Sequence, residues 1–191
     1  MNRSTFSRPV RLSALVLVVM LLLPATSLHA TQTTVELPQQ PYLPLEMAVQ
    51  AASAAVAQCE ADGYRVSVAV VDRGGVLKVL LRADGTGPHT VTSSTRKAYT
   101  AASLGRSTAE LAKNVASNPE IEGLRNMDPQ ILILAGGLPI VVNETVVGGI
   151  GVGGAPGGNL DEACAQAGID AMLAEGSDAE AAAEPTPTPK P

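Results

Sequence analysis

The feature that most constrains the fold is a pair of β-rich blocks, each made of two apolar runs around a turn-forming sequence. In the first block, Val66–Val71 and Val76–Arg82 flank Asp72–Gly75, an order that is typical of a β-hairpin. Both runs are nearly apolar on both faces. We therefore expect a sheet that is covered by helices rather than one that faces water.

The second block begins at Ile131–Leu134, breaks at Ala135–Gly137 and resumes at Leu138–Val142. Asn143–Glu144 supplies the turn, and Thr145–Val152 returns antiparallel. Glycines in this last run leave room where another backbone or a ligand approaches closely: Gly148, Gly149 and Gly151. Their spacing resembles a dinucleotide-binding loop, but no helix opens on these glycines, so a close backbone crossing is the preferred interpretation.

Helical periodicity surrounds both blocks. Apolar residues recur at helical spacing from Leu45 to Cys59, and Gly63 follows as a stop. A second helix is predicted over Thr92–Leu104, a shorter one after a Ser107 or Thr108 cap, and a last one capped by Asn159 with Glu162 completing a capping box. Residues 118–128 are expected to form a surface loop. This order predicts an α+β layer arrangement with an antiparallel sheet.

The N-terminal segment predicts export. Arginines at positions 3, 8 and 11 precede an apolar run, Leu12–Leu23, and the small-residue site that ends at Ala30. This pattern is typical of a signal peptide over residues 1–30, because the run is shorter than the roughly 20 residues of a membrane-spanning helix. We expect a flexible lead-in over residues 31–42, one domain over 43–175 and a disordered tail over 176–191, in a secreted or periplasmic protein without stable membrane insertion.

Charge and composition limit the partners and the core. The chain has 13 basic and 18 acidic residues, and three of the arginines lie in the leader, so the exported chain carries a net charge of about −8. Such a chain repels phosphate backbones, which argues against nucleic acid as a partner. The single Phe also lies in the leader and there is no Trp, so aliphatic residues must build the core.

The cysteines, Cys59 and Cys164, both lie on apolar stripes of predicted helices. In an oxidising compartment a pair of this kind is more often bridged than free, so a disulfide is favoured over two separate buried thiols. A structural zinc site needs four protein ligands and a catalytic one three. Two cysteines with the one histidine outside the leader do not form a typical zinc site.

His89 is that histidine, and it follows the sequence Asp84–Pro88, which breaks all periodicity. Nucleophilic catalysis would need a base of this kind beside a serine, and nothing in the sequence fixes that geometry, so a binding protein is favoured over a catalyst. An imidazole can also serve as an axial ligand to haem iron, with cations such as Arg96 and Lys97 paired to the propionates. The alternative is a solvated loop histidine before a helix.

Six motifs resemble the GlcG/HbpS-like haem-binding family, in the family's order and over nearly all of residues 43–173. They are Val70–Leu77, Asp84–Gly85, Arg96–Ala102, Gly136–Ile140, Val147–Gly154 and Asp161–Cys164. The resemblance implies a profilin-like fold, a five-stranded antiparallel sheet with helices packed on its faces, and assembly into homo-oligomers. It fixes fold better than function.

The same resemblance implies a haem-binding, and for secreted members a haem-sensing, protein. The cofactor-binding residues it suggests are His89, which is also the candidate metal ligand, together with Arg96, Lys97, Tyr99, Thr100, Gly136 and Gly137. Because other members accompany glycolate metabolism, a small-molecule accessory protein or enzyme of hydroxy-acid metabolism stays open as the alternative.

Overall fold

The structure is a computed structural model that describes residue 37 and residues 39–183, with side chains as far as residue 174. The predicted signal peptide, most of the lead-in and the end of the predicted tail lie outside the described residues. Residues 39–183 fall within one compact unit. No helix in the described part of the chain is long and apolar enough to cross a bilayer.

The two predicted hairpins form one antiparallel sheet in the order β2-β1-β4-β3. The strands are β1 (Ser67–Asp72), β2 (Leu77–Arg82), β3 (Gly137–Val142) and β4 (Thr145–Gly153). Between β3 and β4, Asn143 and Glu144 have φ of 47° and 62°. These positive angles at both central residues are those of the hairpin turn that matches the twist of the flanking strands.

The sheet has four strands and not the expected five, because Ile131–Leu134 does not join it. Side chains satisfy much of the backbone of this segment instead. Arg96 Nη2 donates to the Ile131 carbonyl over 2.6 Å, the Leu132 amide donates to Thr100 Oγ1 over 2.8 Å, and Arg125 Nη1 donates to the Ile133 carbonyl over 3.4 Å. Backbone groups that are already paired in this way do not need a neighbouring strand.

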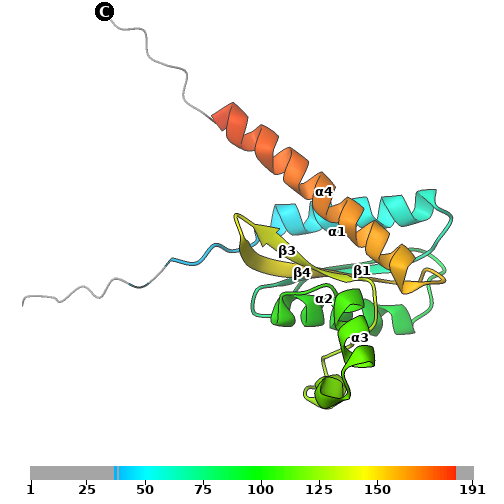
Figure 1. Ribbon diagram of the computed structural model, residues 1–191. Coiled ribbons are helices and arrows are strands. Elements are labelled where there is room, and N and C mark those ends of the chain that lie inside the picture. The colour runs from blue at the N-terminus through cyan, green and yellow to red at the C-terminus, as the bar shows by residue number, and fades with distance from the viewer. Residues whose placement is uncertain (1–36, 38, 184–191) are drawn as a thin grey trace, which may run out of the picture. The chain divides into compact units, whose positions relative to one another are not determined.

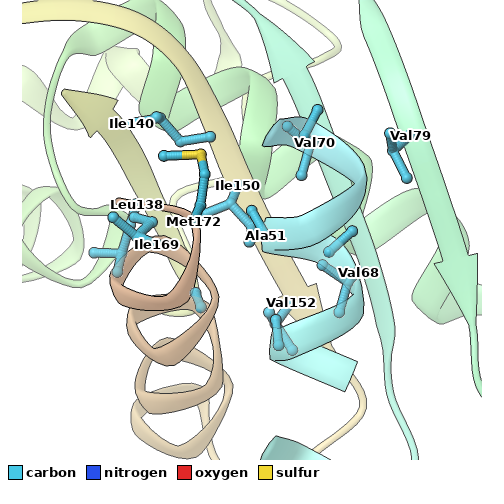
Figure 2. Close-up of a cluster of buried hydrophobic side chains, with 14 of the residues drawn as sticks. Ala51, Val68, Val70, Val79, Leu138, Ile140, Ile150, Val152, Ile169 and Met172 are labelled. Atoms are coloured by element: carbon cyan, nitrogen blue, oxygen red, sulfur yellow. The ribbon is translucent and has the colours of Figure 1, made fainter. Parts of the chain in front are cut away.

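Helices cover both faces of the sheet, as expected from its apolar strands. Figure 1 shows α1 (Leu45–Ala61) and α4 (Gly158–Ala183) on one face and α2 (His89–Leu104) on the other. The main core lies under α1 and α4. In Figure 2, Ala51 of α1 and Met172 of α4 lie next to Ile150 of the sheet, and all three are fully buried.

The other face is packed more closely, because α2 lies directly on the backbone of β4. A Cβ atom built on Gly151 would stand 2.1 Å from the Ser94 carbonyl oxygen, and one on Gly149 would stand 2.4 Å from that of Ala98. Both distances are impossible for a real side chain. The glycine run in β4 therefore exists to let a helix approach, which confirms the interpretation of a close backbone crossing.

A disulfide joins Cys59 of α1 to Cys164 of α4, as the sequence predicted. The two Cα atoms lie 5.6 Å apart, and each residue is at most 1% exposed. The bridge forms because both helices pack side by side on the same face of the sheet, with their apolar stripes toward each other.

Several helix boundaries differ from the predictions. Helix α2 begins at His89 rather than Thr92, so His89 lies in the first turn of the helix and not in the preceding loop. The predicted loop at 118–128 contains a 3-10 helix, η1 (Pro119–Asn126), whose first turn the Asn118 side chain caps. Helix α3 (Thr108–Ser117) is capped by Ser107 as predicted.

Helix α4 differs at both ends. It begins at Gly158, one residue before the predicted Asn159 cap, and the Glu162 carboxylate accepts a hydrogen bond from Ser107 Oγ instead of closing a capping box. At its other end the helix continues to Ala183, through residues expected to belong to the tail. The alanine and glutamate of that stretch are good helix formers, and an existing helix is easily extended.

Candidate functional site

The most buried charge among the predicted site residues is Lys97 on the sheet-facing side of α2. Its side chain is 3% exposed, and Nζ lies 2.8 Å from Asp161 Oδ2 and donates to the Val152 carbonyl over 2.8 Å. Asp161 stands in the first turn of α4, where its other carboxylate oxygen accepts a hydrogen bond from the Ala155 amide. This ion pair joins helices that cover opposite faces of the sheet.

Burial dominates the ionisation of Asp161. Desolvation raises its pKa above the ordinary value, while the hydrogen bond and charge of Lys97 lower it by less. The ammonium of Lys97 is therefore held by protein oxygens and does not face solvent, so its position is that of a structural anchor.

Gly136 and Gly137 surround the same ion pair. A Cβ atom on Gly136 would lie 2.6 Å from Asp161 Cβ and 2.8 Å from Lys97 Nζ, and one on Gly137 would lie 2.5 Å from the Lys97 carbonyl oxygen. The φ of Gly136, 113°, is also unfavourable for a residue with a side chain. The structure thus brings three predicted site residues together, around Asp161.

Arg96 and Thr100 converge at a second point, the backbone of residues 131–132. Thr100 Oγ1 accepts from the Leu132 amide and donates to the Arg96 carbonyl, so its hydrogen-bonding capacity is used within the protein. Arg96 donates one hydrogen bond, from Nη2 to the Ile131 carbonyl oxygen, while its buried Nε has no hydrogen-bond partner among the described residues.

Tyr99 packs rather than points into a site. Its ring lies against Gly75, where a Cβ atom would stand 2.6 Å from Tyr99 Cδ2, and it contacts the satellite core formed by Leu111, Val115, Ile131 and Ile133. The glycine at 75, with φ of 80°, accommodates both the hairpin turn and this ring.

His89 stands apart from the other predicted residues. It is exposed, its ring lies beside Gly87, and it forms no hydrogen bond with another described residue. Ser93 and Arg96 follow at positions i+4 and i+7, which places all three on one side of α2, with about 10 Å of helix between His89 and Arg96. No group of three potential metal ligands occurs among the described residues, so an iron ion there would depend on a porphyrin for its other ligands.

The sequence did not single out Asp161 as a site residue, although Asp161 opens one of the family motifs. A usable signal existed, since Lys97 shares its helix face with the apolar residues Ala98 and Ala101. A lysine on a buried face requires an anionic partner, because an unpaired buried charge is very costly. The partner could then be sought among carboxylates at the ends of apolar elements.

A family model described as "Haem degrading protein HbpS-like" matches residues 43–170. The chain belongs to this family. It is 50% identical to a double mutant of HbpS from Streptomyces reticuli, whose crystal structure aligns with a TM-score of 0.66 over 70% of this chain and 89% of that one. The predicted resemblance is therefore confirmed.

Two further relatives extend the comparison within the HbpS-like family. The protein GlcG of Escherichia coli K12 is 35% identical over 54% of this chain and 78% of its own length. A structure described as a PduOC:heme complex is 25% identical, with a TM-score of 0.63 over 69% of this chain and 95% of that one. The α+β fold with an antiparallel sheet is thus shared with a protein solved in complex with haem.

Proposed function

We propose that this protein binds haem, with the His89 imidazole as an axial ligand and the Arg96 guanidinium as a partner for a propionate. The observation that carries the proposal is the availability of these two groups within a haem-related family. Among the described residues, His89 is exposed and its imidazole has no hydrogen-bond partner, and the Arg96 guanidinium bonds only the Ile131 carbonyl, through Nη2. Lys97 and Thr100 on the same helix are bonded within the protein itself.

The comparisons support this choice of ligand. The family description names haem, and one neighbour of this fold was solved as a haem complex. When bound, haem supplies an iron centre with open axial positions, and an imidazole is a common protein ligand for it. The residues of this chain would hold the iron at His89 and fix the orientation of the porphyrin through a charge-assisted bond from Arg96.

We further propose that the protein acts outside the cytoplasm as a homo-oligomer, with haem sensing as its role. The leader sequence supports export. The exposure of His89 supports assembly, since a porphyrin on this surface needs a second apolar wall to leave water. Mass spectrometry of the exported protein should give a chain that begins at Thr31, and a full-length chain would contradict export with cleavage.

A hemin titration of the purified protein tests the binding proposal. We expect a Soret band that saturates with hemin, changes position in His89→Ala and stays unchanged in Ser103→Ala, an exposed position near the other end of the same helix. Arg96→Gln should keep the band position and weaken binding about tenfold, by loss of one charge-assisted hydrogen bond. A linear, unsaturated titration, or identical spectra for wild type and His89→Ala, would contradict the proposal.

Haem degradation is a second candidate because the family description names it. It can be followed in the same samples, by adding ascorbate to the complex and recording the Soret band with time. Decay that is faster than for free hemin would support degradation. The alternative of a metabolite-binding protein of hydroxy-acid metabolism predicts a different result, in which glycolate raises the melting temperature and hemin binds without saturation.

A further inference from the structure

Two irregularities in the sheet meet at one end of the molecule. In β2, Val79 pairs with Val70 and Leu77 pairs with Val71, so Lys78 is an extra residue. In β4, Gly148 pairs with Ile140 and Val146 pairs with Val141, so Val147 is extra as well. A β-bulge of this kind redirects a side chain, and bulges are enriched beside functional sites.

Both bulged residues line the same cavity, of about 440 Å³, together with Tyr42, Leu43, Asp72 and Arg73. The volume lies in the range of small-molecule sites. Leu43 and Val147 are buried and supply an apolar floor, while the Tyr42 ring is exposed at the rim. Because of the bulge, the cation Lys78 lines this cavity. With strict alternation of side chains along β2, a different residue would have lined it.

The cations of this cavity keep free donors. Lys78 forms no ion pair or hydrogen bond with another described residue. Arg73 uses Nη1 for the Val146 carbonyl over 3.1 Å, and its other donors have no acceptor among the described residues. The Asp72 carboxylate is partly engaged, because Oδ1 accepts from the Val76 amide over 3.0 Å.

From this geometry we infer that the cavity is a binding site for a small organic carboxylate, held by Lys78 and Arg73 over the apolar floor. Two cations and one carboxylate give the lining a net charge of +1, which suits a single negative charge better than a doubly charged phosphate. The floor and the Tyr42 ring suit an apolar or planar body. Arginine binds a carboxylate in a bidentate geometry, and lysine adds a point charge.

This site is separate from the proposed haem surface. Arg73 also lines a cavity with Leu104 and Gly105, at the C-terminal end of α2, whereas His89 is the first residue of that helix. The 16 residues of α2 span about 24 Å. Carboxylate binding and hemin binding can therefore succeed or fail independently.

The test uses benzoate as the probe and neutral benzamide as its isostere, with binding followed by amide chemical shifts of the ¹⁵N-labelled protein. We expect benzoate to shift the amides of Gly74 and Val147 with saturation, and benzamide to have little effect. Lys78→Gln and Arg73→Gln should each weaken benzoate binding about tenfold or more, because each removes an interaction with a charged group. Lys113→Gln, which alters a cation lining a different cavity, should not change it.

Four outcomes would overturn the inference. They are equal binding of benzoate and benzamide, an unchanged affinity in Lys78→Gln, tighter binding of inorganic phosphate than of benzoate, and saturable shifts at Ala163 of the other cavity in place of Gly74. Lys78→Gln should also leave the hemin titration unchanged. A loss of both ligands in a variant that remains folded would contradict the separation of the two sites.

Discussion

The two ends of the sheet use their charged residues in opposite ways. At the end where β4 stops and α4 starts, Lys97 and Asp161 are buried against each other among glycines that leave no spare room. At the end with the bulges, Lys78 and Arg73 line a cavity. Both keep hydrogen-bond donors that no other described residue accepts from. A charge that is paired within the protein is not available to a ligand, whereas a charge left without a partner beside a cavity is.

The largest expected effect on stability comes from breaking the buried Lys97–Asp161 ion pair. Asp161→Ala removes the acceptor of both the buried Lys97 ammonium and the Ala155 amide, which should lower the free energy of unfolding by about 3–5 kcal/mol. Urea denaturation measures it, with Glu110→Gln in the exposed Arg106–Glu110 pair as the control, where at most about 0.5 kcal/mol is expected. A double Lys97→Met, Asp161→Leu variant should recover most of the loss, since it leaves no unpaired charge. A loss below about 1 kcal/mol in Asp161→Ala would refute the anchoring role.

A smaller effect on stability is expected when one glycine at each end of the sheet is replaced by alanine, which adds one methyl group. Gly151→Ala drives a Cβ atom into the backbone of α2 and should cost about 1–3 kcal/mol, the usual range for overpacking. Gly74→Ala meets only the Asp72 carboxylate, at 3.3 Å, and should change stability by less than about 0.5 kcal/mol. Thermal unfolding of both variants provides the comparison, and equal losses would show that the two ends are packed alike.

The pH dependence of stability gives a further distinction. Burial raises the pKa of Asp161, so the folded protein keeps this proton at pH values where the unfolded chain has released it. Stability should therefore fall as the pH rises from about 4 through the raised pKa, at no more than about 1.4 kcal/mol per pH unit for one proton. Urea titrations at several pH values give the free energy of unfolding of the wild type and of Asp161→Asn. The difference between the two isolates the contribution of Asp161. If the wild type instead gained stability relative to Asp161→Asn as the pH rises over this range, the pKa of Asp161 would be lowered in the folded protein and not raised.

The smallest effect should come from Lys78, whose ammonium has no partner among the residues that the structure describes. Lys78→Gln is expected to change the free energy of unfolding by less than about 0.5 kcal/mol. Urea denaturation of this variant beside Asp161→Ala compares a lysine at the cavity with a lysine whose buried partner has been removed. A loss of 2 kcal/mol or more would show that Lys78 supports the bulge and is not reserved for a ligand.

Much of the fold could be read from the sequence, because hairpin turns and helical stripes are local signals. The pairing of Cys59 with Cys164 followed from two such stripes. The segment Ile131–Leu134 could not be read correctly, since its apolar composition is that of a strand and its hydrogen-bond partners, such as Thr100, come from distant elements. The sequence did not predict the continuation of α4 beyond Gly176, because the low hydrophobicity of this stretch is typical of a disordered tail.

The candidate site was harder to read than the fold. A motif shows which residue types occur, but not whether they face a ligand. Lys97 and Thr100 prove to be bonded within the protein, whereas the Arg96 guanidinium bonds only through Nη2. The cavity at Lys78, in contrast, is not indicated by any motif in the sequence. An alternating pattern carries no information on register, so the two bulges that redirect Lys78 and Val147 become visible only once the strands are paired.

The bridge between α1 and α4 has a consequence for how the chain can be cut. The two cysteines are 105 residues apart in sequence, so the loop that they close contains the entire sheet, α2, α3 and η1. A protease that nicks the exposed surface anywhere within this loop, for example in η1, releases no fragment. The nicked molecule would keep its mass apart from one added water until a reductant separates the halves.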